Sequence, residues 1–322
     1  MRSSQIKDKP IIIIGCPRSG TTMLRLLLSN HSKIVIPHEV PVFEIIYNAI
    51  RGDNDNIVVN SLIELLYKDK LFCDLEIKKN LLLERISSNS ELNKKEIISS
   101  IYLLYLEKHK PNALIWGDKT IGNIDFLENI YNTFPESRFI YLMRDPRDVL
   151  VSIRNVKWKF YKTPKSKIYH VDNPIGLAGL WNYCYGAIHK LLEKTDAKCH
   201  ILKYEDLIKS PKDEMNEVFK FIGVESEESV FDFYKDTSSI PEKRRLKNHI
   251  NTSKPIINNN AEKYRTHLTQ NDLKLIEAFI DKNSYGIESN KSEATKVVNS
   301  LHYKASYVLN RISFAIKNRV LP

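Results

Sequence analysis

The sequence predicts an α/β protein with a central parallel sheet flanked by helices. Strand-like apolar runs alternate with helical patterns between residues 10 and 225, which is typical of βαβ units. The first run, at 10–16, consists of Pro10, four isoleucines and a glycine before Cys16. Such continuous apolarity indicates a parallel strand covered on both faces. A small-residue loop and a helical pattern from Met23 follow, so the chain opens with a strand, a loop and a helix.

Further elements follow in order along the chain. The pattern at 41–110 is mostly helical, and the helix expected at 211–222 starts at a proline and ends before Gly223, a residue suited to that position. Thr269 or Asn271 would cap the last expected helix. Between them, residues 241–265 look like a basic loop. The remaining expected elements are strands at 113–116, 138–143 and 199–204 and helices at 147–156 and 270–283.

Composition restricts the class of protein. The chain has 322 residues, of which 42% are hydrophobic, so it can form a sizeable core and is not disordered throughout. Its net charge of +10 favours anionic partners such as phosphate or sulfate ligands, acidic polymers, nucleic acid or a membrane surface. Four scattered cysteines suit a reducing compartment. No apolar run approaches the roughly 18–20 residues of a membrane span, and the first ten residues are polar. We therefore expect a cytoplasmic protein, or one attached peripherally to a membrane.

The sequence divides into a main domain at 1–288 and a basic amphipathic tail at 289–322. The tail carries six basic residues against one acidic residue, Glu293. Leu301, Val308 and Ile312 are among the apolar residues that fall on one helical face. Two interpretations stay open: a terminal helix packed on its own domain, or an interfacial helix on anionic lipid.

The loop after the first strand has the spacing of a phosphate-binding loop. Gly15 and Gly20 are separated by four residues and followed by two threonines, although Thr21 occupies the position of the usual lysine. A strand end, a small-residue turn and a helix start direct several backbone N–H groups at one point, where the helix dipole favours an anion. Arg18 adds a cation and Ser19, Thr21 and Thr22 add hydroxyls. The alternative is an ordinary strand-to-helix turn.

A nucleotide triphosphatase would need the loop lysine and a carboxylate at a strand end to hold Mg²⁺. Here the best strand end leads into Arg144, with Asp145 only after it. The pattern therefore favours an anion site without a metal ion.

Three segments resemble the sulfotransferase family that uses 3′-phosphoadenosine 5′-phosphosulfate (PAPS). Residues 12–24 are similar to its 5′-phosphosulfate loop, and 138–152 to its 3′-phosphate segment. The Tyr204-Glu205-Asp206-Leu207 stretch with its following Pro and Phe-Ile-Gly is similar to a third family motif. The pattern is nearest to the branch that includes tyrosylprotein and carbohydrate sulfotransferases, which has arginine in the loop. The resemblance implies the P-loop-like sulfotransferase fold.

The resemblance also implies roles for individual residues. Glu39, which precedes aromatic residues as in the family, would be the general base, with His38 as the alternative. Lys119 and Arg18 would stabilise the sulfuryl and phosphate oxygens. PAPS would be the donor and 3′,5′-adenosine bisphosphate (PAP) the product, with no metal. The residues expected to bind them are Arg18, Ser19, Gly20, Thr21 and Thr22 at the 5′ end, and Arg144, Ser152 and Tyr204 at the 3′-phosphate.

Several assignments stay open at this point. Arg147 competes for the 3′-phosphate, and Lys254, Lys263 and Arg265 would contribute to closure over the cofactor. The expected acceptor is a hydroxyl of a carbohydrate or glycolipid, with a tyrosyl acceptor as an alternative. In the second interpretation of the tail, it would contact a membrane. Two other function classes remain: a small-molecule kinase using ATP and Mg²⁺, and a non-enzymatic nucleotide or nucleic-acid binder. Because no helix-turn-helix, aromatic stacking motif or zinc module is found, nucleic acid is not an expected partner.

Overall fold

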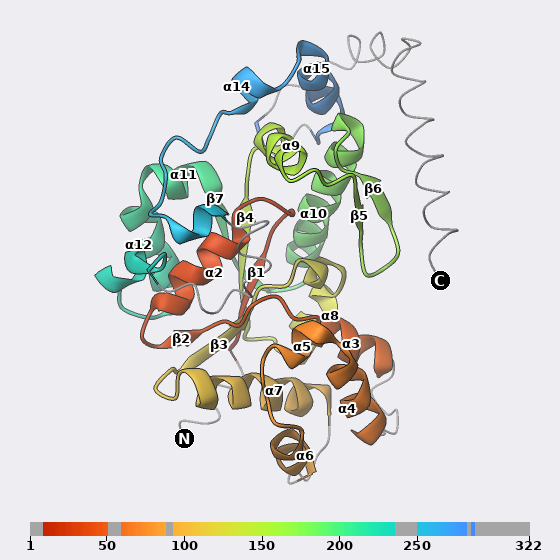
Figure 1. Ribbon diagram of the computed structural model, residues 1–322, viewed down its shortest axis with the longest axis vertical. Coiled ribbons are helices and arrows are strands. Elements are labelled where there is room, and N and C mark those ends of the chain that lie inside the picture. Colours follow the sequence, from red (N-terminus) through yellow and green to blue (C-terminus); the bar gives the residue numbers. More distant parts are fainter. Residues whose placement is uncertain (1–8, 51–58, 88–92, 236–249, 282–284, 287–322) are drawn as a thin grey trace. The chain divides into compact units, whose positions relative to one another are not determined.

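The computed structural model describes residues 9–50, 59–87, 93–235, 250–281 and 285–286, which are drawn in colour in Figure 1. The chain forms two compact units. The first contains the chain up to Asp145, together with Lys162–Ile168 and Cys184–Ala261. The second contains Pro146–Tyr161, Tyr169–Tyr183 and the chain from Glu262.

A five-stranded parallel sheet forms the centre of the first unit, with the order β2-β3-β1-β4-β7. Its strands are β1 (Ile11–Ile14), β2 (Ile34–Val35), β3 (Ile115–Asp118), β4 (Arg138–Met143) and β7 (Lys198–Lys203). The four isoleucines of β1 are each at most 1% exposed, because neighbours pair on both sides and helices cover both faces. This confirms the predicted α/β class with a central parallel sheet.

Helices bury the two faces of this sheet. On one face, α2 (Thr21–Asn30), α11 (Tyr204–Lys209) and α12 (Pro211–Ile222) pack their apolar sides on Ile11 and Ile13. Beside β3, Tyr102 of α7 (Lys94–His109) stacks on Trp116 at 4.3 Å between ring centroids. The other helical elements of the unit are α3 (Val42–Ala49), α4 (Val59–Lys68), α5 (Lys70–Cys73), α6 (Lys79–Ser87), η1 (Ile121–Asp125), α8 (Leu127–Thr133), η2 (Glu228–Asp232) and η3 (Ile250–Ser253).

The second unit is mostly helical and contains α9 (Pro146–Asn155), α14 (Tyr264–His267) and α15 (Gln270–Phe279). Thr269 and Asp272 form a capping box at the start of α15, as the expected Thr269 cap predicts. Asp272 also pairs with Arg154 of α9 at 2.8 Å. Two elements run through both units along the chain: the hairpin of β5 (Phe160–Lys162) and β6 (Ile168–His170), and α10 (Pro174–Lys194).

Most expected elements are confirmed and a few are shifted. The strand at 138–143 and the helix at 211–222 have the expected bounds. The strand expected at 113–116 lies instead at Ile115–Asp118, since its first two residues pair with β2 and its last two with β1. The last helix ends at Phe279 rather than at 283. The tail at 289–322 and part of the basic loop lie outside the described residues, so the domain boundary and the tail's lipid contact stay predictions.

The sequence did not predict β2 or the β5–β6 hairpin. Strand β2 has two residues and the hairpin strands have three each, so they are too short to show a clear period-two apolar pattern. In the described part of the chain, no helix is both long enough and apolar enough to cross a membrane.

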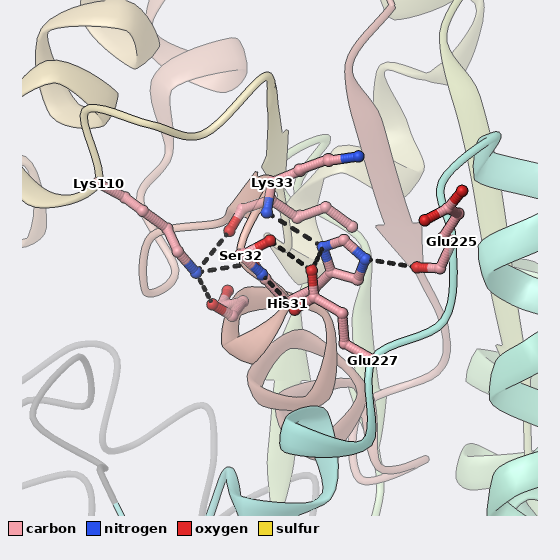
Figure 2. A network of polar contacts seen from close by, with 8 residues as sticks. His31, Ser32, Lys33, Lys110, Glu225 and Glu227 are labelled. Carbon is pink, nitrogen blue, oxygen red and sulfur yellow. Dashed lines mark hydrogen bonds and ion pairs between the residues drawn. The ribbon is translucent and has the colours of Figure 1, made fainter.

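The C-terminal end of α2 is closed by a lysine from the end of α7 (Figure 2). Lys110 Nζ donates hydrogen bonds to the carbonyl oxygens of Ser29, His31 and Ile34, at 2.6, 2.8 and 3.2 Å. A cation is stabilising at this end of a helix, where carbonyl groups lack intrahelical partners.

Hydrogen bonds of His31 and Ser32 stabilise the same end of α2 (Figure 2). The buried His31 ring accepts a hydrogen bond from the Lys33 amide at Nδ1, at 3.1 Å, so Nε2 carries the proton and donates to the Glu225 carbonyl at 2.8 Å. The Ser32 amide donates to Glu227 Oε2 at 2.8 Å. This end of the helix is therefore fastened by the protein's own groups.

Candidate active site

The loop between β1 and α2 has the backbone of an anion-binding turn. Arg18 has a φ of 72° and Gly20 a φ of 97°, both in the left-handed region, and the Ser19 amide donates to the Cys16 carbonyl at 3.1 Å. Alternation of right- and left-handed residues turns successive N–H groups toward one point. A non-glycine residue at positive φ is uncommon. The backbone thus supports the anion site predicted from spacing.

Two glycines of this loop are required by close packing. A Cβ on Gly15 would lie 2.7 Å from the carbonyl oxygen of Leu142. A Cβ on Gly20 would lie 2.6 Å from the ring of Tyr204. Tyr204 begins α11 immediately after β7, so the aromatic ring that follows one strand supports the loop that follows another.

Ser19 marks where the protein leaves a polar group unsatisfied. Its side chain is 0% exposed, and its Oγ has no hydrogen-bond partner among the described residues. A buried hydroxyl without a partner costs about 1–3 kcal/mol. The N-cap residue of α2, Gly20, provides no side-chain cap, and the first turn of the helix contains no acidic residue. Phosphate or sulfate oxygens fit this donor set, because the helix N-terminus and the hydroxyl both favour an anion.

Arg144 follows β4 and contacts the same loop. Its Nη1 donates to the Arg18 carbonyl at 3.1 Å and its Nη2 to the Asn260 carbonyl at 2.9 Å. Its guanidinium carbon lies 4.2 Å from the ring centroid of Tyr204. Tyr204 Oη in turn accepts a hydrogen bond from Asn260 Nδ2 at 2.5 Å. Burial and the charge of Arg144 lower the pKa of Arg18, which Glu39 opposes.

The predicted base and cation form an ion pair. Lys119, which directly follows β3, donates from Nζ to Glu39 Oε1 at 2.7 Å and to Thr22 Oγ1 at 3.2 Å. The Lys119 side chain is 5% exposed, so a surface salt bridge does not describe it, whereas Glu39 is 24% exposed and open to solvent on one side. Burial lowers the pKa of Lys119, and Glu39 opposes that shift by its charge and hydrogen bond. The structure therefore brings Glu39, Lys119 and the loop residue Thr22 together.

A buried network lies behind this pair. Asp118 accepts hydrogen bonds from Tyr102 Oη and Asn123 Nδ2, each at 2.5 Å, and from Thr120 Oγ1 at 3.3 Å. Thr120 Oγ1 also lies 3.2 Å from the amide and 2.9 Å from the carbonyl oxygen of Val40, the residue after Glu39. Burial raises the pKa of Asp118 to about 6, although its hydrogen bonds and Lys119 oppose the shift. Thr120 thereby fastens the Glu39 segment to the end of β3.

Arg25 is a buried cation near this site that the sequence analysis missed. It lies on α2 with 1% exposure, and its Nη1 donates to the Ile36 carbonyl at 3.1 Å. Burial lowers the pKa of Arg25 to about 10, whereas Tyr105 and Glu39 act in the opposite direction. A signal existed in the sequence, because Arg25 interrupts a run of leucines on a helix with a strongly apolar face.

Other predicted residues lie elsewhere. Ser152 belongs to α9 of the second unit, so its pairing with Arg144 stays a prediction. Arg147 pairs with Glu277 at 3.0 Å and stacks on Tyr264 at 4.0 Å, which gives it a structural role within the second unit. The alternative base, His38, hydrogen-bonds through Nε2 to a backbone carbonyl on α5, at 3.0 Å.

The structure also describes the contacts of one basic loop residue and the burial of two tryptophans. Arg265 forms an ion pair with Glu262 at 2.9 Å, and the cofactor contacts expected of it, Lys254 and Lys263 stay predictions. Trp116 and Trp181 are core residues, with 0% and 1% exposure.

Comparison with known proteins agrees with this geometry. The sulfotransferase family profile matches residues 10–228. The chain is 24% identical over 292 residues to nodulation protein NoeE of Sinorhizobium fredii, which covers 85% of this chain and 64% of that protein. It is 22% identical over 220 residues to a Drosophila melanogaster protein-tyrosine sulfotransferase, which covers 68% of this chain and 39% of that protein.

Among solved structures, a sulfotransferase domain from the curacin biosynthetic pathway superposes with a TM-score of 0.55 at 18% identity, over 92% of this chain and 98% of that one. Since the family profile covers more than half of the chain, the protein belongs to the sulfotransferase family. This confirms the predicted resemblance and its P-loop-like fold. The chain spans less than two thirds of the length of either curated relative.

Proposed function

We propose that the protein transfers a sulfuryl group from PAPS to an acceptor hydroxyl. The observation that carries the proposal is the juxtaposition of the Glu39–Lys119 pair with the loop around Ser19, through the contact of Lys119 with Thr22. A base, a cation and an anion-binding helix end are the groups that such a transfer needs. Family membership supports the same conclusion.

The residues present fit the donor. Arg18, Ser19, Gly20, Thr21 and Thr22 would hold the 5′-phosphosulfate. Arg144, Ser152 and Tyr204 would hold the adenosine 3′-phosphate, because a planar guanidinium binds phosphate oxygens in pairs. When bound, the donor supplies the sulfuryl group and accepts the bonding electrons at its 5′-phosphate.

The chain's own residues would then act in two ways. Glu39 accepts the proton of the acceptor hydroxyl as the new oxygen–sulfur bond forms. Lys119 changes partners as this occurs, because the neutral Glu39 attracts it less than the carboxylate did. Its charge becomes available to the sulfuryl oxygens, while Arg18 and the α2 N-terminus stabilise charge on the departing phosphate.

For the acceptor, we propose a hydroxyl of a carbohydrate or glycolipid. The net charge of +10 supports an acceptor that is already anionic. The Drosophila relative's name indicates tyrosine as its acceptor, so a tyrosyl peptide is the competing substrate. The cytoplasmic location and the contact of the tail with a membrane stay predictions.

The test is transfer of label from ³⁵S-PAPS to three acceptors: a neutral oligosaccharide, a uronate-containing oligosaccharide and a tyrosyl peptide, all in EDTA. We expect label in an oligosaccharide. Glu39→Gln should lower kcat by about 10²–10⁴-fold, because general-base catalysis contributes about that much, while PAP still binds. Phosphate transfer from ATP with Mg²⁺, or full activity in Glu39→Gln, would contradict the proposed function.

A further inference from the structure

A charged side chain buried in an apolar environment needs compensation, and Arg25 is such a side chain. It is 1% exposed on the apolar side of α2, among leucines that pack against the sheet. Burying an ionised group costs several kcal/mol unless opposite charge and hydrogen bonds offset that cost. The groups that act on it are therefore informative about its role.

Arg25 donates a hydrogen bond to the backbone segment that contains the proposed base, Glu39. The guanidinium donates to the Ile36 carbonyl at 3.1 Å, and the same oxygen accepts from Ser29 Oγ at 3.1 Å. Ile36 lies between β2 and Glu39, and Thr120 fastens Val40 on the other side. The base is thus held by α2 before it and by the end of β3 after it.

The charge of Arg25 also acts on the base. Burial lowers the pKa of Arg25, and the charge of Glu39 is one of the groups that oppose this shift. Electrostatic coupling is reciprocal, so Arg25 in turn favours the ionised form of Glu39. The same cation disfavours the charged form of Lys119. Among the described residues, the charged groups that act on Glu39 include Lys119 at 2.7 Å, Arg18 of the loop and Arg25 of α2. Of these three, Arg25 lies outside both the donor loop and the ion pair.

We propose that Arg25 is a positioning residue of this site, which fastens the 36–40 segment to α2 and supplies the buried positive charge that keeps Glu39 in its proton-accepting form. Its side chain acts through Glu39 and through the backbone. The inference rests on Glu39 being the base in the proposed function. Its test, however, needs no turnover.

The experiment is a ¹³C carboxyl NMR titration of protein labelled at glutamate, with the Glu39 signal assigned by its loss in Glu39→Gln. Two neutral variants are compared with wild type. Arg25→Met suits the apolar surroundings, and Arg25→Gln keeps a donor for the Ile36 carbonyl. Removing a unit charge at this depth should raise the pKa of Glu39 by about one unit in either variant.

Two controls separate charge from structure. Arg25→Lys keeps the charge and should hold the pKa of Glu39 within about 0.3 units of wild type. Ser29→Ala removes a neutral hydrogen bond to the same Ile36 oxygen and should also leave it within about 0.3 units. Folding is checked from thermal melting and from the other glutamate signals.

An unchanged Glu39 pKa in a folded neutral variant would overturn the proposal. So would an equal shift in Ser29→Ala, because geometry alone would then explain it. If Glu39 titrates as expected but no label is transferred from PAPS to any acceptor, the electrostatic role stands and the proposed reaction fails, so the two failures are distinguishable.

Discussion

The two ends of α2 differ in how their polar groups are satisfied. At the C-terminal end, Lys110 donates to three carbonyl oxygens and His31 links the chain to Glu225. At the N-terminal end, the N-cap residue Gly20 provides no side-chain cap, and the buried Ser19 hydroxyl lacks a partner among the described residues. The same helix is therefore completed by the protein at one end and left for an anion at the other.

Because of this difference, we expect one end of α2 to contribute to the stability of the protein and the other to ligand binding. Groups at the closed end offset the helix dipole and should contribute to the free energy of unfolding. Groups at the open end are held in costly conformations, with Arg18 at a φ of 72° and Ser19 unsatisfied. Such costs are typical of sites that a ligand completes. Variants at the two ends should therefore change different measurements.

The largest effect is expected from Gly20→Ala at the open end. Its Cβ would lie 2.6 Å from the Tyr204 ring, and its φ of 97° disfavours any side chain. We expect PAP affinity to fall by about 100-fold or more, since the backbone donors of the loop would be displaced. Isothermal titration calorimetry measures this. Gly186→Ala, where a Cβ meets nothing within 4 Å, is the matched control and should bind PAP normally.

Next in size is Lys110→Met at the closed end. Three carbonyl oxygens lose a charged donor, so the free energy of unfolding should fall by about 2 kcal/mol. Urea denaturation measures this, with Lys108→Met as a surface control expected within about 1 kcal/mol of wild type. PAP affinity of the folded Lys110→Met protein should be unchanged. If Lys110→Met also lost PAP binding, the inference that the closed end of α2 acts on stability alone would be wrong.

A smaller effect is expected from Ser19→Ala. It removes an unsatisfied buried hydroxyl, so stability without ligand should be unchanged or rise by up to about 1 kcal/mol. PAP affinity should fall by about tenfold, because one hydrogen bond to a charged group is lost. Ser137→Ala, which also removes a buried hydroxyl without a partner among the described residues, should leave PAP affinity unchanged. Equal PAP affinity in both variants would contradict the role given to Ser19.

The smallest effect is expected from Glu227→Gln at the rim of the closed end. Burial of Glu227 is outweighed by hydrogen bonds from Ser32 and by the positive charge of Lys110, which help to lower the pKa of Glu227. A carboxylate with a lowered folded-state pKa stabilises the protein above its unfolded pKa and loses that contribution as the pH falls. At pH 7, the free energy of unfolding of wild type should therefore exceed that of Glu227→Gln by less than about 1 kcal/mol. This difference in the free energy of unfolding should vanish by about pH 3. A gap that widens on acidification would contradict the assigned contacts.

The two ends of α2 also differ in how far the sequence predicted them. The open end was predictable, because glycine spacing and the run from Gly15 to Thr22 reflect a local backbone requirement. Lys119 and Glu39 were predicted from a resemblance rather than from physics, and their 2.7 Å contact depends on two strands meeting at one sheet edge. The closed end was not predicted. Lys110 lies 76–81 residues from the carbonyls it contacts, and such pairings have no local pattern.

The role of Arg25 could be predicted from the sequence only in part. A single arginine among leucines indicates a buried or functional charge, but its target, the Ile36 carbonyl, becomes visible only when α2 and the chain after β2 are packed. The hairpin of β5 and β6 was missed for a different reason, since each of its strands has only three residues and is too short to show a strand pattern.

The proposed donor site combines the open end of α2, which would bind the 5′-phosphate of the adenosine bisphosphate, with Arg144, which would bind its 3′-phosphate. Calorimetric titration of wild type and Arg144→Ala with PAP in EDTA, beside ATP with Mg²⁺, tests this site. We expect metal-independent binding of PAP to wild type, weakened at least tenfold in Arg144→Ala, because a guanidinium contact to phosphate is lost. No PAP binding, or tighter binding of ATP with Mg²⁺, would contradict it.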